Sequence, residues 1–508
     1  MDPSPDYAVQ MHGIVKTFGN FCALNKVDLN VKKQTIHSIL GENGAGKTTL
    51  MNILYGLYEA DEGKIYLNGK EVKIKSPADA IKLGIGMVHQ HFMLVENFTV
   101  AENIILGDED TTGFGVLDYN KSYEKIEALV REYGFEVDLE AKIRDISVGM
   151  QQRVEIIKAL YRGADTLIFD EPTAVLTPQE VTNLIKVMHS LVERGKTIII
   201  ITHKLREIME SADECTIVRR GTYMGTVAVA DTDEQDLAAR MVGRQVTLKV
   251  DKTKAHPGEV VLSVKGLSVA DDRGIEQVRG LDLDIRAGEI VGIAGIDGNG
   301  QEELVDAICN LRRAKGGTIS VKGTEVQNKT PKDTFASGVA TIPSDRQRWG
   351  LVLPMMVEEN MVLETHFTDE FGDLTLDYDK IEAHTKELID SFDIRPGGSE
   401  REPISALSGG NQQKAIIARM VNVKPAVLIA FQPTRGVDVG AIEFIHKTLI
   451  AERDRGCAIL LISFELDEVM NVSDTIKVIY HGQIKGSFEQ GTVDEKQLGL
   501  LMAGGELK

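Results

Sequence analysis

Short apolar runs recur along the chain, and each is bounded by polar or turn-forming residues. The clearest runs are residues 36–40, 166–169, 197–201, 289–294, 427–431 and 458–462. Because a strand that is covered on both faces is apolar at every position, runs of this length predict buried strands of a parallel sheet. Helical stretches separate the runs. This alternation of strands and helices predicts an α/β fold with a largely parallel sheet.

The apolar runs are too short to cross a membrane. The longest, residues 197–201 and 426–431, fall far short of the about 20 residues that span a bilayer. The first residues carry acid and proline instead of a basic segment followed by an apolar one, so we expect no signal peptide. If the protein works at a membrane, another subunit must cross it.

The sequence contains two copies of one domain. Three pairs of segments match, and the spacing between the members of a pair is constant except for a small insertion before the last. The pairs are residues 24–31 with 278–285, 41–46 with 295–300, and 172–173 with 433–434. A spacing that persists over such a distance predicts a tandem repeat.

The boundary between the copies is a short linker. Lysines, Pro257 and Gly258 occur in residues 245–258, a composition that is typical of a connecting segment. We therefore place the first domain at residues 1–245 and the second at residues 259–508.

The composition and the net charge argue against a nucleic acid partner. The 508 residues include 77 Asp and Glu against 57 Lys and Arg, which gives a formal net charge of −20. A nucleic acid partner would need a broad basic face, so we expect none. The four cysteines have no metal-ligand or redox spacing, and we expect reduced thiols in a cytosolic compartment.

A phosphate-binding loop follows the first predicted strand. Residues 41–48 have the sequence GENGAGKT and lie between an apolar run and a helical stretch. Glycines let backbone N–H groups point inward at phosphate oxygens, assisted by the N-terminus of the following helix. Lys47 then places positive charge on the β- and γ-phosphates, and the hydroxyl group of Thr48 binds magnesium. The loop predicts a site for a nucleoside triphosphate.

Two acidic residues end another predicted strand of the same copy. Asp170 and Glu171 follow residues 166–169, and the carboxyl ends of strands are where α/β sheets bind ligands. Asp170 would hold magnesium through its waters, and Glu171 would orient and polarise the attacking water. Such a pair alone is most often a solvated turn. Together with the phosphate loop it predicts an ATPase.

Further motifs resemble those of the ATP-binding-cassette family. Residues 146–153 are similar to the family signature with substitutions, and residues 407–413 match it without them. The resemblance implies two nucleotide-binding domains, each with a RecA-like P-loop core, a helical signature subdomain and a small antiparallel β part. It also implies that Gln90 contacts magnesium and the water, that His203 contacts the γ-phosphate, and that Phe18 stacks on adenine.

The resemblance implies that two such domains pack head to tail, so that each ATP lies between the phosphate loop of one and the signature of the other. The first copy's phosphate loop would then face the intact signature of the second copy. The catalytic residues of this predicted site are Lys47, Gln90, Glu171 and His203, and its metal ligands are Thr48, Gln90 and Asp170. The predicted ATP-binding residues are Phe18, Gly41, Asn43, Gly44, Gly46, Lys47, Thr48, Thr49, Ser408, Gly409, Gly410 and Asp438.

The second copy has lost most of these groups. The replacements are Gln301 for Lys47, Glu302 for Thr48, Ser344 for Gln90, Phe431 for Asp170, Gln432 for Glu171, Phe464 for His203 and Asp272 for Phe18. Removing one transition-state donor typically costs about 10²–10³-fold in rate, so we expect no hydrolysis from this copy's own loop.

The substituted signature belongs to the other copy. Ser147 is retained there, but Val148 replaces a glycine and Thr177 stands where Asp438 stands in the second copy. Head-to-tail packing would thus sort all intact parts into one composite site and all degraded parts into the other. Random decay would scatter the losses.

Two classes of function remain open for such an ATPase. One is the motor of a membrane importer, and the other is a soluble tandem cassette protein acting on a machine such as the ribosome. Soluble members usually have two competent sites and a long charged linker, so we favour the importer. Residues 433–440 are similar to the sugar and nucleoside importers, and residues 88–92 and 428–432 are closer to nucleoside than to ribose or galactose importers.

The resemblance also implies cofactors, partners and location. The protein would use ATP and Mg²⁺ and bind two integral-membrane permease subunits at the cytoplasmic face of a bacterial cell membrane. An extracellular lipoprotein-type solute-binding protein would act through the permeases.

Overall fold

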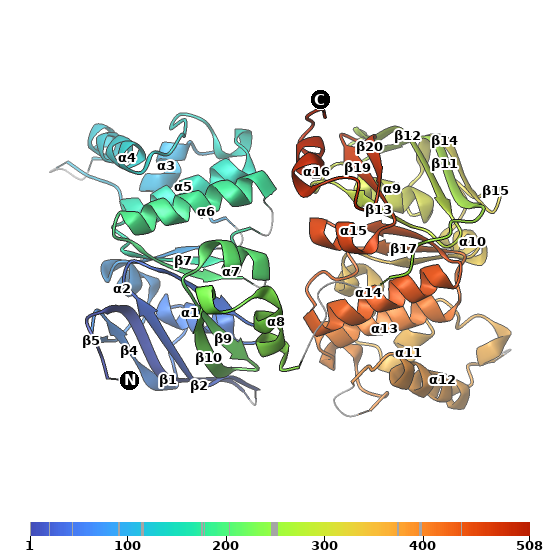
Figure 1. Cartoon of the computed structure of the whole chain (residues 1–508), viewed down its shortest axis with the longest axis horizontal. Coiled ribbons are helices and arrows are strands. Elements are labelled where there is room, and N and C mark those ends of the chain that lie inside the picture. Colours follow the sequence, from blue (N-terminus) through green and yellow to red (C-terminus); the bar gives the residue numbers. More distant parts are fainter. Residues whose placement is uncertain are drawn as a thin grey trace. The chain divides into compact units, whose positions relative to one another are not determined.

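The chain folds into two α/β units, Met1–Val246 and Thr247–Lys508. Figure 1 follows the elements of each unit along the chain in the computed structural model. The structure describes residues 2–19, 21–42, 44–89, 92–112, 116–173, 176, 178–202, 204–244, 252–372, 375–395, 399–437 and 439–507. Among these residues, no helix combines the length and the hydropathy needed to span a membrane.

A four-stranded antiparallel sheet begins the first unit. Along its second strand, Leu29 and Val31 are buried and Asn30 between them is half-buried, so one face of the sheet packs on the core. That face meets Leu50 and Met51 of the helix after the phosphate loop. In spatial order the strands are β2 (Phe21–Lys32), β1 (Tyr7–Phe18), β4 (Glu62–Leu67) and β5 (Lys70–Val72).

A six-stranded, largely parallel sheet forms the centre of the first unit. Every residue of the strands at 36–40, 166–170 and 197–201 is buried, because both faces of the sheet are covered. Ile168 faces the antiparallel sheet, and its neighbours Leu167 and Phe169 face the opposite helices. In spatial order the strands are β10 (Thr222–Ala228), β9 (Glu214–Arg219), β3 (Ile36–Leu40), β8 (Thr197–Ile201), β7 (Thr166–Asp170) and β6 (Ile85–Val88).

Helices cover the central sheet and form a helical subdomain beside it. The helix α1 packs with the antiparallel sheet, whereas α5 and α6 pack on the other face (Figure 1). The helices α3 and α4 pack against α5. The bounds are α1 (Lys47–Leu54), α2 (Pro77–Lys82), α3 (Val100–Ile105), α4 (Tyr119–Tyr133), α5 (Val148–Tyr161), α6 (Pro178–Glu193), α7 (Leu205–Ser211) and α8 (Glu234–Val242).

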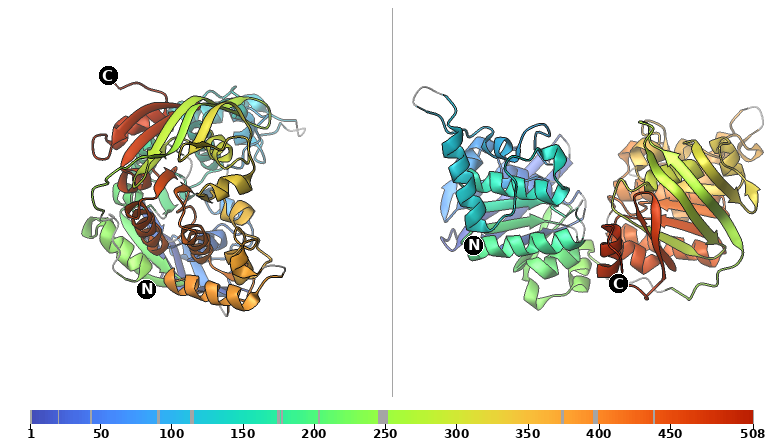
Figure 2. Two further views of the ribbon diagram at one scale, coloured as in Figure 1. Left: turned by 90° about the vertical axis from the view of Figure 1, so that its right-hand side faces the viewer. Right: turned by 90° about the horizontal axis from the view of Figure 1, so that it is seen from above.

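The second unit repeats this plan. Its antiparallel sheet, green to yellow in Figure 2, is a curved layer with the strand order β12 (Glu276–Arg286), β11 (Val260–Ala270), β14 (Ala314–Val321) and β15 (Thr324–Glu325). Its central sheet has the order β16 (Val339–Ile342), β17 (Val427–Phe431), β18 (Ala458–Ile462), β13 (Ile290–Ala294), β19 (Thr475–Tyr480) and β20 (Gln483–Glu489). The helices are α9 (Gln301–Ile308), α10 (Pro331–Ala336), α11 (Val357–Met361), α12 (Tyr378–Ser391), α13 (Gly409–Asn422), α14 (Val439–Asp454), α15 (Leu466–Val472) and α16 (Glu495–Met502).

The predicted fold class is confirmed. The apolar runs form buried strands of the two central sheets, and their neighbours pair in parallel. Two strand boundaries differ by one residue from those predicted from the sequence, since β7 extends to Asp170 and β13 begins at Ile290. The antiparallel sheets and helical subdomains are those that the family resemblance implied.

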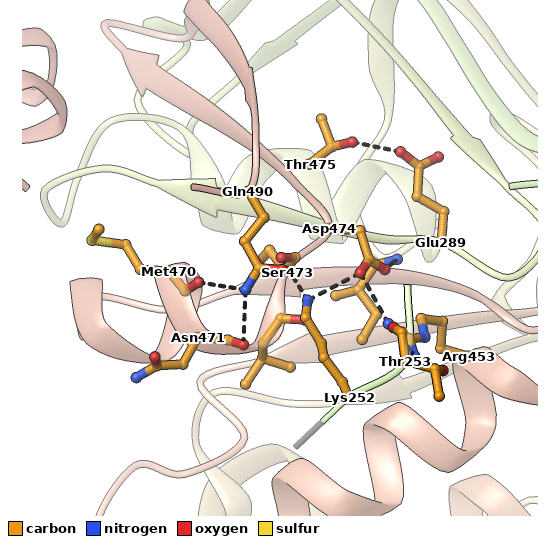
Figure 3. A network of polar contacts seen from close by, with 12 residues as sticks. Lys252, Thr253, Glu289, Arg453, Met470, Asn471, Ser473, Asp474, Thr475 and Gln490 are labelled. Carbon is orange, nitrogen blue, oxygen red and sulfur yellow. Dashed lines mark hydrogen bonds and ion pairs between the residues drawn. The ribbon is translucent and has the colours of Figure 1, made fainter. Parts of the chain in front are cut away.

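The end of the connecting segment binds the second unit. Figure 3 shows Lys252 and Arg453 converging on Asp474, at 3.0 and 2.9 Å from its Oδ1 atom. The guanidinium group of Arg453 also donates to the carbonyl oxygen of Thr253 at 3.0 Å. The other oxygen of Asp474 accepts from the N–H of Ile290, at the start of β13. Residues before 259, which the sequence places in the linker, are thus fastened to this unit.

We expect the substitution Arg453→Met to destabilise the second unit by about 3 kcal/mol, because breaking a buried ion pair leaves a buried charge poorly compensated. Arg453 is 1% exposed. The matched control is Arg273→Met, since Arg273 is 75% exposed and its contact with Asp271 lies at the surface. Urea unfolding of the full chain measures both variants. Equal midpoints would show that the network does not stabilise the unit.

Candidate functional site

The phosphate loop of the first unit joins β3 to α1. Gly46 directly precedes α1 and has a φ of 99°, in the left-handed region that favours glycine. A β-carbon on Gly41 would lie 2.3 Å from the carbonyl oxygen of Val218, so the backbone there approaches β9 too closely for a side chain. The first N–H groups of α1 have no partner within the helix. Together with the turn before them they form an arrangement that binds phosphate.

Lys47 lies inside this loop. Its side chain is 5% exposed, and its Nζ atom donates to the carbonyl oxygens of Gly41 at 2.7 Å and Glu42 at 3.0 Å. Burial lowers the pKa of Lys47, whereas the carboxylates of Glu171, Asp170 and Glu42 oppose that shift. The ammonium group is therefore held by backbone oxygens next to the acidic pair, where a phosphate group would be its strongest partner.

The acidic pair lies at the end of β7. Asp170 is buried, and its pKa is raised to about 6 by burial and by Glu171, with Lys47 acting in the opposite direction. Glu171 has a φ of 45°, and its N–H donates to the carbonyl oxygen of Ile201 at 2.9 Å. Each residue thus leaves the strand in a fixed direction, beside Lys47. The structure brings these three predicted residues together.

The other predicted residues of the first unit are placed in part. Phe18 ends β1, is 43% exposed, and meets Tyr58 edge to face with ring centroids 5.3 Å apart. Such an open ring can stack on a base. Thr48 is exposed, and Thr49 is half-buried in the first turn of α1. The predicted residues Asn43, Gln90, His203 and Asp438 lie outside the residues that the structure describes.

The phosphate loop of the second unit is closed by its own side chain. Gln301, which replaces Lys47, is 2% exposed. Its Oε1 atom accepts from the N–H of Asn299 at 3.0 Å, and its Nε2 atom donates to the carbonyl oxygen of Ile296 at 3.0 Å. One loop N–H that could bind phosphate is therefore already bonded within the loop.

Aromatic packing replaces the acidic pair in this unit. The rings of Phe431 and Phe464 meet edge to face with centroids 6.5 Å apart. Gln432 keeps the backbone of Glu171, with a φ of 53° and an N–H donating to the carbonyl oxygen of Ile462 at 2.7 Å. The backbone conformation of the turn is retained, but both carboxylates are replaced.

The nucleotide side of the second unit is also acidic. Glu302 and Glu303 lie in the first turn of α9, and Asp297 lies in the loop before it. Asp272, which replaces Phe18, forms an ion pair with Arg312 at 2.6 Å. Carboxylates at the start of a helix suit its dipole but repel a triphosphate.

The two signature segments begin equivalent helices. Ser408 precedes α13 and accepts from the N–H of Asn411, and Ser147 precedes α5 and accepts from the N–H of Met150. Val148 is 40% exposed, so the substituted signature presents an isopropyl group at its surface. Gly409 has no side chain at that position in the second unit, and a β-carbon there would lie 2.6 Å from the Nη2 atom of Arg346.

Arg346 was missed by the sequence analysis. Its side chain lies against Gly409 and donates to the carbonyl oxygen of Arg435 at 2.8 Å. It belongs to no motif that we identified. The only sequence signal was its position two residues after Ser344.

Comparison with known proteins identifies the family. The family model described as ABC transporter matches residues 24–174 and 278–435, one match in each unit. The chain belongs to the ABC transporter family. The resemblance predicted from the motifs is thereby confirmed, and as a member of this family the chain is an ATPase.

Three relatives align over nearly the full length. The nucleoside import ATP-binding protein NupA of Lactococcus lactis subsp. cremoris is 54% identical over 98% of both chains. The guanosine import ATP-binding protein NupO of Bacillus subtilis is 51% identical over 99% of this chain and 98% of the relative. The ribose import ATP-binding protein RbsA of Caldanaerobacter subterraneus subsp. tengcongensis is 38% identical over 98% and 99%.

A solved structure shares the tandem fold. The structure is an archaeal ribosome recycling factor in complex with a ribosomal stalk protein, with a TM-score of 0.59 and 19% identity over 94% of this chain and 90% of that one. At this identity the likeness shows the fold alone.

Proposed function

We propose that this ABC transporter ATPase drives a nucleoside importer. The observation that carries the proposal is the identity of 54% and 51% with nucleoside and guanosine import proteins, against 38% with a ribose import protein. The transported solute does not reach an ATP-binding subunit, so relatedness and not site geometry supports this choice. A ribose or galactose importer and a soluble factor acting on the ribosome are the alternatives that an experiment must separate.

The first unit's loop holds the ATP that is hydrolysed. Lys47 and the N–H groups at the start of α1 bind the phosphates, and Phe18 stacks on the adenine. Glu171 orients the attacking water and accepts its proton, while His203 contacts the γ-phosphate. The buried position of Lys47 beside the acidic pair supports these roles.

The residues around Lys47 also fit a magnesium ion. The hydroxyl group of Thr48, the carboxylate of Asp170 and the amide oxygen of Gln90 are the hard oxygen donors that Mg²⁺ prefers. The ion would neutralise charge on the phosphate oxygens. Asp170 already lies buried next to the loop, where burial and the neighbouring Glu171 raise its pKa, and a cation beside the pair would offset the repulsion between the two carboxylates.

The second unit contributes its signature to the same ATP. In head-to-tail packing, Ser408, Gly409, Gly410 and Asp438 would complete the site of Lys47. The opposite site would combine the closed loop of Gln301 with the substituted signature at Val148. The sorting of intact and degraded parts supports this arrangement, which leaves one competent site for each chain.

The membrane partners follow from the same family logic. Two permeases would cross the membrane and bind the ATPase at its cytoplasmic face, near Gln90 in one unit and Ser344 in the other. An extracellular lipoprotein-type protein would deliver the solute to the permeases. ATP binding would bring the two units together and switch the permeases, and hydrolysis would reset them.

Uptake by the assembled complex tests the proposed substrate. The chain is reconstituted with its permeases and binding protein in liposomes that contain ATP, and uptake of labelled nucleosides, ribose and galactose is compared. We expect nucleoside uptake that stops in Glu171→Gln. Uptake of a sugar without a nucleoside would replace the substrate proposal. ATPase activity that responds to ribosomes and to neither solute would overturn the importer.

A further inference from the structure

Arg346 lies between two segments of the second unit that are far apart in sequence. It begins the one-turn π-helix η3 (Arg346–Gly350), which follows β16. Its Nη1 atom donates to the carbonyl oxygen of Arg435 at 2.8 Å, and its Nη2 atom lies 3.4 Å from the carbonyl oxygen of Gly436. A β-carbon on Gly409 would lie 2.6 Å from Nη2. The guanidinium group thus fills the space beside the signature.

The local environment leaves Arg346 as a cation with unused hydrogen-bonding capacity. Its Nε atom is buried and has no hydrogen-bond partner among the described residues. The neighbouring Asp345 accepts from the N–H groups of Gln347 and Arg348, each at 3.0 Å, and so serves to start η3. Burial and Arg435 lower the pKa of Arg346, with Asp345 opposing them. An arginine remains protonated under these conditions.

The first unit has a charge of opposite sign beside its signature, next to Gly149, which corresponds to Gly410 and not to Gly409. Phe92 corresponds to Arg346, and Glu180 occupies the space beside the substituted signature, where a β-carbon on Gly149 would lie 2.5 Å from its Oε1 atom. Ala441 corresponds to Glu180 in the second unit. The intact signature therefore has a guanidinium neighbour, and the substituted signature has a carboxylate neighbour.

The carboxylate of Glu180 fits a helix cap within its own segment, whereas the guanidinium group of Arg346 donates to a segment distant in sequence. Residues 177–180, with threonine first and glutamate last, have the pattern of a capping box at the start of α6. Arg346, by contrast, connects the carbonyl groups of an exposed segment with the signature. Those carbonyl groups lie at the surface, where water would satisfy them.

We propose that Arg346 is a positioning residue for the competent ATP site. It fixes the spacing between the signature and residues 435–437, which lead to Asp438, and it keeps a positive charge beside both. The inference rests on the proposed head-to-tail site, in which these two segments reach the same ATP. Errors of about 1 Å in such a constellation can cost 10²-fold in rate.

ATP hydrolysis by the assembled complex tests this role. We expect Arg346→Ala to lower kcat about tenfold and to change the KM for ATP by less than about threefold, because the phosphates are first held by the loop of Lys47. Arg346→Lys, which keeps the charge and a donor, should recover most of kcat. Free guanidinium ion should partly restore Arg346→Ala. The matched control is Arg348→Ala, whose exposed side chain stacks on Trp349 in the same helix.

Several outcomes separate this role from a structural one. A kcat of Arg346→Ala within twofold of the parent overturns the inference, as does an equal loss in Arg346→Lys without rescue by guanidinium ion. If Arg346→Ala does not fold, Arg346→Gln is measured in its place. Glu171→Gln is measured in parallel. If that variant stays active, the proposed competent site fails. If it is inactive while Arg346→Ala is normal, only the role of Arg346 fails.

Discussion

Replacing Glu171 by glutamine is expected to lower ATP hydrolysis by the assembled transporter about 10²–10⁴-fold, the usual contribution of a general base. Glutamine keeps the shape of the side chain but cannot accept the proton of the attacking water. The left-handed backbone at Glu171 is not at risk, because Gln432 adopts the same conformation in the second unit. The variant should therefore fold and bind ATP while failing to cleave it. Steady-state ATPase assays and equilibrium ATP binding on the same preparation measure both properties.

The second unit supplies the matched control. Gln432→Ala changes the equivalent residue, which directly follows Phe431, where the first unit has the predicted metal ligand Asp170. We expect its kcat to stay within about twofold of the parent, because no hydrolysis depends on this position. If Glu171→Gln keeps more than half of the parent activity, the competent site has been assigned to the wrong unit.

The sequence predicted most of the fold because its strongest signals are local. Residues 198–201 and 458–462 are apolar at every position, which predicts strands that are buried on both faces. Because the two units are repeats, a strand predicted in one unit is also predicted at the matching position of the other. The spacing of the glycines and Lys47 in the loop is rarely found outside phosphate-binding loops.

The closure of the second loop could not be predicted in the same way. That Gln301 replaces Lys47 was clear from the repeat, but its hydrogen bonds to Asn299 and Ile296 depend on the curvature of the loop. Arg346 is a similar case, because it reaches Gly409 across a long separation in sequence. Contacts between distant segments leave no periodic signal in a single sequence.

One ATP bound per chain is the second result that we expect, with Lys47 as the residue on which binding depends. Lys47→Ala should weaken ATP binding about 100-fold, because a charge-assisted hydrogen bond contributes about 1.5–3 kcal/mol and the ammonium group serves two phosphates. The vacated space leaves the acidic pair without its cation, which adds repulsion. Binding is measured by calorimetry on chains that also carry Glu171→Gln, so that ATP is not consumed.

The control variants lie at the equivalent position of the second unit. Gln301→Ala should leave both the stoichiometry and the affinity of the parent unchanged, because that loop contributes to no bound nucleotide. Gln301→Lys restores the ammonium group but should not create a second site, since Asp297 and Glu302 remain and Phe431 replaces the metal ligand.

The number of ATP molecules bound per chain shows whether the second unit binds a nucleotide with its own loop. If its loop is closed by hydrogen bonds within the loop, a phosphate must displace the amide group of Gln301 and also overcome the nearby carboxylates. Each cost is modest alone, but Gln301 does not replace the ammonium group of Lys47 and Phe431 does not replace the carboxylate of Asp170. Two ATP molecules per chain, one of them insensitive to Lys47→Ala, would show that the second unit holds a nucleotide without cleaving it. One ATP per chain, lost in Lys47→Ala and unaffected by Gln301→Ala, would show that the second unit acts on ATP only through its signature.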